Sequence, residues 1–271
     1  MEWDKLTSKE FPDAVTASQG LCLLPFGCIE KHGDHLPLGM DSIAAYEIAC
    51  AAARTEPAVV FPYHFLGAIV EGRHQPGTIG LKYELLIPLM ENIFDEIGRN
   101  GFHKILIANF HGGNQTLLSF LSVLLLEKRK PYNLYCSDLW TFRREDFTSP
   151  AEAKIDGHAG ESETSVMMHL HPDLVKAPAA TEDGMPARRL KPLHDALLRT
   201  GADWYANYPN HLMSDGTPGS AAKGEKFVAI YIRNLIRQIQ LIKKDHTTPA
   251  LFAEFHARIA NPGYAPARTE K

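Results

Sequence analysis

Acidic and histidine side chains are concentrated in one short stretch of the chain, residues 27–41. This stretch holds Glu30, His32, Asp34, His35 and Asp41. Mixed imidazole and carboxylate ligands suit zinc, manganese or iron. In an extended segment Glu30 and His32 point the same way, because side chains repeat every two residues, and a carboxylate such as Asp41 can bridge two ions about 3.5–4 Å apart. The stretch therefore predicts a metal site, and the alternative is a polar surface loop that happens to be rich in histidine.

A second polar cluster, residues 109–114 (NFHGGN), follows an apolar run. His111 fits a further metal ligand. Gly112 and Gly113 let the backbone approach a ligand closely, and the amides at the start of the next helix favour an anion or oxyanion. The alternative is a glycine-rich turn with a solvated histidine. Two such clusters at the ends of two different strands favour the metal site.

A third cluster, residues 157–165, contains His158, Glu161 and Glu163. His158 could act as a general acid or base, because its ordinary pKa lies near neutrality. The two glutamates lie in the first turn of a predicted helix, where carboxylates also stabilise the helix start, so both roles stay open. The segment around His74 (HQPGT) is typical of a turn, and its spacing alone gives His74 little functional weight.

The elements that must position these side chains alternate between strands and helices. Short apolar runs predict strands, and apolar residues at helical spacing predict helices. Repeated β-α-β units imply a mostly parallel sheet with helices on both faces. We therefore expect an α/β fold with one domain over residues 1–271, and an excursion at about 180–220 that acts as a lid or an oligomer contact. The predicted strands are 21–26, 58–61, 104–109 and 133–137, and the predicted helices are 42–54, 83–99, 115–130, 161–171 and 227–244.

Composition excludes several other classes of protein. The chain of 271 residues carries a net charge of −4, which argues against a general binder of nucleic acid or of anionic membranes. Its 4 cysteines match neither a zinc ribbon nor a CxxC redox motif. The longest apolar run is too short to span a membrane and the N-terminus is polar, so a cytoplasmic location is expected. The sequence contains no GxSxG, P-loop or GxGxxG motif.

The segments LPFGCIEKHGDHLPLGMD, HQPGTIGL, NFHGGN and GHAGESETSVMMHLHPDLV occur in this order. Together they resemble the successive signatures of the creatininase family. The resemblance spans about residues 23–175. It implies a single three-layer α/β/α domain, a centre of two divalent metal ions (zinc, with manganese or iron as variants) and a homohexamer. Characterised members of the creatininase family hydrolyse amide-type carbon–nitrogen bonds in small substrates or trim a peptide, and one branch opens a cyclic keto-inositol derivative.

The resemblance also assigns roles to individual residues. Glu30 and His111 match ligands of the first metal, His32 matches a ligand of the second, and Asp41 matches the bridging carboxylate. His158 matches the histidine that moves a proton to the leaving group. In creatininase itself a glutamate lies two residues after the histidine that matches His111, and this chain has Gly113 at that position. The remaining ligand is therefore expected from Glu161, with Glu163 second and otherwise catalytic. His74, Gly112, Gly113 and Trp140 are expected to line the substrate site.

The resulting hypothesis is a metal-dependent hydrolase. A metal-bridging hydroxide would attack the carbonyl of a small, polar, cyclic amide-type substrate. Two alternatives stay open. One is hydrolytic opening of a cyclic keto-sugar or keto-inositol, through a C–C or lactone bond, on the same two metals. The other is a non-catalytic member of the fold that only binds metal or ligand. Small-molecule substrates are expected as partners, and neither nucleic acid nor a membrane is.

Overall fold

A parallel β-sheet forms the centre of the molecule in the computed structural model, which describes residues 1–142, 149–176 and 186–263. In these residues the strands are β1 (Leu21–Phe26), β2 (Val59–Val60), β3 (Lys104–Asn109) and β4 (Asn133–Asp138), in the order β2-β1-β3-β4, and all neighbouring pairs are parallel. Every residue of β1 and β3 is buried, as expected for strands covered on both faces. The four predicted strands are confirmed, although β2 is shorter than its prediction.

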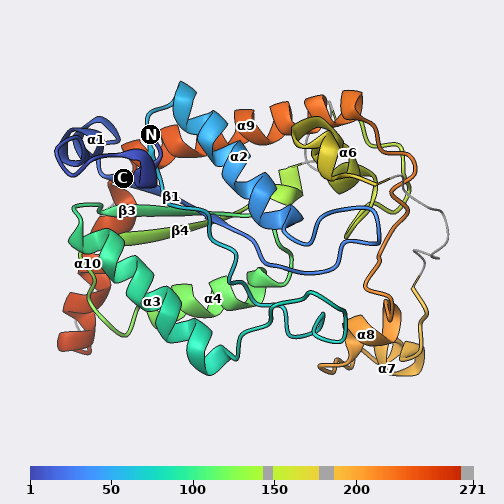
Figure 1. Ribbon diagram of the computed structural model, residues 1–271. Coiled ribbons are helices and arrows are strands. Elements are labelled where there is room, and N and C mark those ends of the chain that lie inside the picture. Colours follow the sequence, from blue (N-terminus) through green and yellow to red (C-terminus); the bar gives the residue numbers. More distant parts are fainter. Residues whose placement is uncertain (143–148, 177–185, 264–271) are drawn as a thin grey trace.

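Helices cover both faces of this sheet (Figure 1). On one face lie α2 (Met40–Thr55), α6 (Glu161–Leu170) and α9 (Ala221–Lys244), and on the other lie α3 (Tyr83–Arg99) and α4 (Asn114–Leu124). Alternate residues of β1 enter the two cores: Leu21 and Leu23 pack with α2 and α9, whereas Cys22, Leu24 and Phe26 pack with α3 and α4. The predicted three-layer α/β/α architecture is confirmed.

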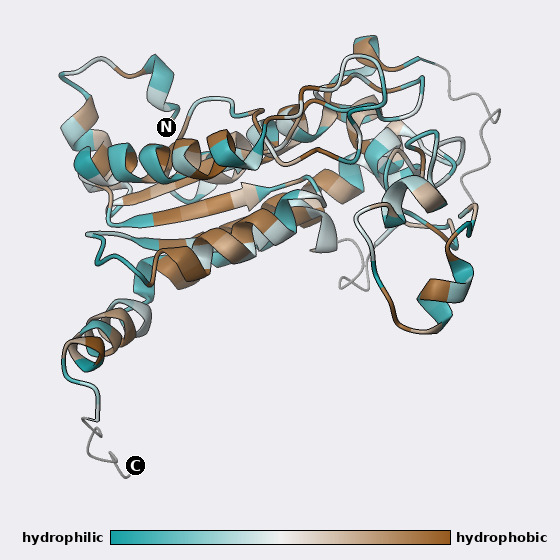
Figure 2. Ribbon diagram, turned by 90° about the horizontal axis from the view of Figure 1, so that it is seen from below, coloured by the Kyte–Doolittle hydropathy of each residue, from teal (hydrophilic) through white to brown (hydrophobic). Residues whose placement is uncertain are grey.

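Hydropathy explains why these helices lie flat on the sheet. In Figure 2 the strands are apolar along most of their length, whereas the helices mix apolar and polar residues.

Helix α9 packs closely against α6, so that a Cβ atom added to Gly224 would lie 1.9 Å from the carbonyl oxygen of Ser165. Helix α9 also begins six residues before its prediction, because the Ser220 side chain caps it by accepting a hydrogen bond from the Lys223 amide.

Helix α4 ends at Leu124, before the end of its predicted range. The basic residues that follow, Lys128, Arg129 and Lys130, do not continue the helix. Lys128 and Lys130 instead form ion pairs with α3: Lys128 Nζ lies 2.7 Å from Glu91 Oε1, and Lys130 Nζ lies 2.7 Å from Asp95 Oδ1. The charges of Lys128 and Lys130 are thus compensated by acidic residues of α3.

Several elements were not predicted. They are α1 (Phe11–Ala17), α7 (Lys191–Asp195), α8 (Asp203–Asn207), α10 (Thr247–Ala260) and short 3-10 turns at Trp3–Lys5, Leu139–Thr141 and Pro172–Leu174. Helices α7 and α8 belong to the predicted excursion and lie at the opposite end of the molecule from α1 and α10 (Figure 1). No helix among the described residues is long and apolar enough to cross a membrane.

Candidate metal centre

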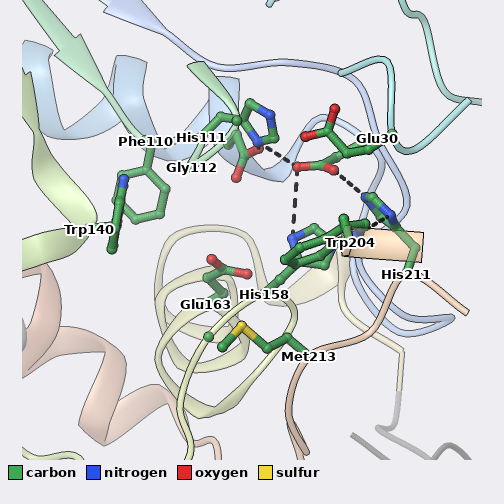
Figure 3. A pocket seen from close by; sticks show the side chains of 14 residues that line it. Glu30, Phe110, His111, Gly112, Trp140, His158, Glu163, Trp204, His211 and Met213 are labelled. Carbon is green, nitrogen blue, oxygen red and sulfur yellow. Dashed lines mark hydrogen bonds and ion pairs between the residues drawn. The ribbon is translucent and has the colours of Figure 1, made fainter. Parts of the chain in front are cut away.

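A pocket of about 400 Å³ lies where the strands end. The register aligns the last residues of three strands, Phe26 with Asn109 and Asn109 with Asp138. The carboxyl ends of parallel strands are the usual place for a binding crevice in an open α/β sheet. Polar and aromatic side chains from all three predicted clusters meet there (Figure 3). The pocket is lined by Glu30, Asp41, Glu71, Phe110, His111, Gly112, Gly113, Trp140, Gly157, His158, Glu163, Trp204, His211 and Met213.

Glu30 and His32 enter the site from the loop after β1. Both side chains are fully buried, and His32 Nε2 lies 3.9 Å from Glu30 Oε1. The backbone of Gly33 has a φ of +60°, which glycine adopts without strain, and it turns the chain away directly after His32. The other ionisable residues of this loop point elsewhere: His35 Nε2 lies 2.8 Å from Thr164 Oγ1, and Asp34 is exposed.

Asp41 lies in the first turn of α2 and is buried. Its two oxygens face two different imidazoles. Oδ1 lies 3.1 Å from His32 Nε2, and Oδ2 lies 3.1 Å from His111 Nδ1. The Cys28 thiol donates to Oδ2 at 3.4 Å. A carboxylate that presents one oxygen to each of two ligand sets has the geometry of a bridging ligand.

The protonation of His111 is fixed from its far side. Its Nε2 lies 3.0 Å from the carbonyl oxygen of Ala68, which only accepts hydrogen bonds, so Nε2 carries the hydrogen. Its Nδ1 lone pair then faces Glu30 Oε1 at 2.6 Å. Glu30 Oε1 is buried and has no hydrogen-bond partner in the described structure. Two acceptors this close need a proton or a metal ion between them, and a buried imidazole beside two carboxylates is a donor set that fits a metal ion.

The pKa values of these groups reflect the same arrangement. Burial lowers the pKa of His111, but the neighbouring Cys28, Glu30 and Asp41 raise it by more, well above its ordinary value. For His32, burial is outweighed by Asp41 and Glu30, which raise its pKa to about 10. The metal-free site thus holds protons where cations would bind, and metal uptake must displace them.

His158 has the opposite character. Burial, aided by His32 and His211, lowers its pKa to about 3, so the imidazole is neutral. Its Nε2 donates to the carbonyl oxygen of Lys31 at 2.7 Å, and its Nδ1 lies 3.8 Å from Glu30 Oε1. The backbone of the next residue, Ala159, is in the left-handed region with a φ of +58°. A neutral imidazole with its lone pair toward the pocket can accept a proton there.

The two glutamates of α6 face opposite sides of the helix, since residues two apart are separated by about 200° around the axis. Glu163 lines the pocket, and its Oε2 lies 3.9 Å from His32 Nε2 and accepts a hydrogen bond from the Ala159 amide at 2.6 Å. Glu161 points away. It is fully buried against the amides of Glu152 and Ala153 and the ammonium group of Lys223. The structure therefore corrects the expectation that Glu161 supplies the missing ligand.

The residues expected to line the substrate site are divided in the same way. Gly112, Gly113 and Trp140 line the pocket. A Cβ atom on Gly113 would lie 2.4 Å from His111 Nε2, so only glycine fits beside this imidazole. His74 does not line the pocket. Its ring is exposed and lies between the carbonyl oxygens of Glu71 and Pro209, where it anchors the loop of the excursion.

Sequence reasoning missed His211 and Trp204. His211 was one of several scattered histidines, and nothing in its local sequence distinguishes it. It comes from the excursion, follows α8, and places its Nε2 2.5 Å from Glu30 Oε2. Trp204, on α8, donates from its indole Nε1 to His211 Nδ1 at 2.8 Å. The contact between His211 and Glu30 depends on the excursion folding over the strand ends, because these two residues lie 181 positions apart in the sequence.

Three named proteins are similar to this chain. A mycofactocin precursor peptide peptidase of Mycolicibacterium smegmatis is 28% identical over 236 residues, covering 83% of this chain and 86% of that protein. A creatinine amidohydrolase of Pseudomonas putida is 27% identical over 188 residues, covering 63% of this chain and 72% of that protein. A 3-dehydro-scyllo-inosose hydrolase of Thermotoga maritima is 25% identical over 249 residues, covering 81% and 77%.

Solved structures show the same fold. The crystal structure of a protein from Bacteroides fragilis matches with a TM-score of 0.71 at 26% identity, covering 84% of this chain and 91% of that one. A creatininase mutant described as Zn–Zn type matches with a TM-score of 0.73, and a creatininase described with Mn matches with 0.72, at 22% and 21% identity and each over 90% of this chain. A sequence model of the Creatininase family, described as creatinine amidohydrolase, matches residues 4–239. With most of its 271 residues matched, this chain belongs to the creatininase family of hydrolytic enzymes.

Proposed function

We propose that this pocket holds two divalent metal ions and hydrolyses an amide-type carbon–nitrogen bond. The observation that carries the proposal is the orientation of Asp41, whose two oxygens face different imidazole nitrogens at the same distance, 3.1 Å. Glu30 lies beside one of these nitrogens and Glu163 beside the other. This arrangement gives two ligand sets that share one carboxylate. The first is Glu30, Asp41 and His111, and the second is His32, Asp41 and Glu163.

The donor set also indicates which ions would fit. Each set combines one imidazole nitrogen with carboxylate oxygens, which suits zinc, manganese or iron. Structures that share this fold are described with zinc or manganese, and this supports the same two metals here. When bound, the two ions would lower the pKa of a water molecule and polarise the substrate carbonyl.

His158 would move the proton that this reaction requires. Its neutral imidazole can accept a proton from the attacking water and return it to the leaving nitrogen. The hydrogen bond from Nε2 to the Lys31 carbonyl holds the ring so that Nδ1 faces the carboxylates. The next residue, Ala159, has a left-handed backbone and lies in the same turn as His158.

The pocket walls describe the substrate. Phe110, Trp140, Trp204 and Met213 supply apolar surface, and Glu71 supplies a further carboxylate. A volume of about 400 Å³ admits a small molecule or the end of a peptide. The names of the relatives support both, because one is a creatinine amidohydrolase and another a precursor peptide peptidase.

A second candidate reaction is the opening of a cyclic keto-inositol. The similarity to a 3-dehydro-scyllo-inosose hydrolase favours it. The same residues would serve, with His158 returning the proton to a leaving carbon instead of a leaving nitrogen. The walls of the pocket, and not the ligand sets, must then decide between the two reactions.

The experiment that tests the proposal measures metal content per chain on protein purified without chelator. We expect about two equivalents, and loss of both in a Glu30→Ala/His32→Ala variant. The metal-loaded protein is then assayed against formamides, cyclic amides, short peptides and cyclic keto-inositols. No metal in the wild type after reconstitution with zinc, manganese and iron would refute the proposal and favour a non-catalytic binding protein. Turnover of keto-inositols alone would transfer the assignment to the second candidate.

A further inference from the structure

His211 differs from the other imidazoles of the site in which nitrogen carries its hydrogen. In His32, His111 and His158 the nitrogen away from the carboxylates approaches a backbone carbonyl, at 3.2, 3.0 and 2.7 Å. Carbonyl oxygens only accept hydrogen bonds, so the neutral form of each of these three imidazoles has its lone pair on the side of the carboxylates. Each can therefore act as a ligand or a base.

The far nitrogen of His211 meets a donor instead. The indole Nε1 of Trp204 can only donate, and it lies 2.8 Å from His211 Nδ1. His211 Nδ1 must therefore be the acceptor, and the hydrogen of the neutral ring is on Nε2. This N–H points at Glu30 Oε2 at 2.5 Å. His211 thus cannot offer a lone pair to a metal from Nε2, although it lies among groups that could otherwise hold one.

The backbone of His211 supports a functional role for this arrangement. Its φ is +56°, in the left-handed region that residues other than glycine rarely adopt. Such strain persists only when the surroundings impose it, and it concentrates at functional sites. The side chain is 1% exposed, and its ring lies 4.7 Å from the ring of His158 and 5.5 Å from that of Trp204, measured between centroids.

We propose that Trp204 and His211 form a positioning pair that fixes how Glu30 binds its metal. By donating to Oε2, His211 occupies one oxygen of Glu30 and leaves only Oε1 to face His111 and the ion. Glu30 then acts as a ligand through a single oxygen. The excursion between residues 186 and 213 is therefore part of the metal centre and does more than cover the pocket. This inference depends on the proposed metal centre, because it concerns the ligand Glu30.

The test uses cobalt(II) as a spectroscopic probe in the full-length protein. Cobalt affinity is measured by competition with a chromophoric chelator, and its visible absorption reports the number of ligands. The variants are His211→Ala, His211→Gln and Trp204→Phe. Glutamine restores an N–H donor near the Nε2 position, and phenylalanine keeps an aromatic ring but removes the indole donor. His74→Ala is the matched control, since it removes one of the two side-chain hydrogen bonds to the Pro209 carbonyl of the same loop without touching Glu30.

We expect His211→Ala to weaken cobalt binding about 10- to 100-fold, the usual effect of losing a group that orients a ligand. Its absorption should fall, because Glu30 can now bind through both oxygens and raise the coordination number. His211→Gln should recover most of the affinity and the spectrum. Trp204→Phe should lie between the wild type and His211→Ala, and His74→Ala should resemble the wild type in both measurements.

Three results would overturn the inference. The first is wild-type affinity and spectrum in His211→Ala. The second is a His211→Gln variant as weak as His211→Ala. The third is an equal loss in His74→Ala, which would indicate only general loosening of the loop. A wild type that binds no cobalt would instead refute the proposed metal centre itself. Thermal unfolding of each metal-free variant shows that it is folded.

Discussion

The two glutamates of α6 provide the sharpest test of how this site is built. They are two residues apart in the sequence, yet Glu163 faces the pocket and Glu161 faces the opposite side of the helix. The change to glutamine is the same in both cases and removes one negative charge. We expect Glu161→Gln to reduce the stability of the protein and leave its metal content unchanged. Glu163→Gln should reduce metal retention and have a smaller effect on the stability of the metal-free protein.

The magnitude for Glu161 follows from its contacts. The carboxylate accepts hydrogen bonds from Ala153 N at 2.7 Å and Glu152 N at 3.0 Å, and pairs with Lys223 Nζ at 2.6 Å. Removing one member of a fully buried pair costs about 3–5 kcal/mol. Lys223 keeps a second carboxylate, Glu152, at 3.1 Å, and glutamine keeps one acceptor oxygen. We therefore expect a loss of about 2–4 kcal/mol, or roughly 5–10 °C in Tm for a chain of this size.

The pH dependence of this loss gives a second readout. Although burial raises the pKa of Glu161, the hydrogen bonds from Lys223, Ala153 and Glu152 outweigh it, and the pKa lies below its ordinary value. A carboxyl whose pKa is lowered by folding stabilises the protein above its unfolded pKa, and this contribution is lost as the pH falls through the folded value. The Tm difference between wild type and Glu161→Gln should therefore be largest at pH 7. It should shrink as the pH falls below the ordinary pKa of a glutamate.

The assay combines thermal unfolding of metal-free protein at several pH values with metal content after dialysis. A Glu161→Gln variant with wild-type Tm that loses metal would refute this reasoning and return Glu161 to the ligand set. Wild-type metal content in Glu163→Gln would exclude Glu163 as a ligand.

Three further predictions concern the centre, and one concerns assembly. Asp41→Asn should lower metal content from about two equivalents to one or fewer, measured by elemental analysis; two retained ions would exclude the bridge. His158→Ala should keep its metal while kcat falls about 10²- to 10⁴-fold; unchanged turnover would remove His158 from the mechanism. Cys28→Ala should weaken metal binding up to about tenfold by freeing Asp41 Oδ2 from the thiol, whereas Cys28→Ser should not; equal affinities would show that the donor is unimportant. Light scattering should give a mass several times 30.1 kDa, and a monomer would contradict the expected hexamer.

Much of the fold follows from local patterns in the sequence. The strand at residues 104–109 is a short, mostly apolar run, and the range 83–99 carries its apolar residues at helical spacing, so both were predicted with the observed boundaries. Residues 115–130 show where such patterns fail. Their apolar spacing continues past Leu124, but ion pairs to α3 favour a turn. Tertiary contacts of this kind leave no local signal.

The site shows the same limit. Clusters that follow strands are brought together by the parallel sheet, and this is why Glu30, Asp41 and His111 could be singled out. To choose between Glu161 and Glu163, one must know which side of α6 faces the pocket, and the sequence of the first helical turn does not show this. His211 needed the path of the whole excursion. Residues far apart in sequence, on segments without strong periodicity, therefore had to be found in the structure.

Asn114, at the start of α4, links the end of β3 to two loops of the site through one buried amide. Its Oδ1 accepts from Ala68 N at 2.8 Å, while its Nδ2 donates to Asn109 Oδ1 at 3.0 Å and to the Gly27 carbonyl at 3.3 Å. None of these bonds involves an ion. A frame closed in this way should stay assembled without the proposed metals, unlike a zinc finger, which unfolds without its metal. If the proposed metals bind here, the protein could exchange one metal for another in place, and its working metal would follow the supply in the cell as well as the ligands it offers.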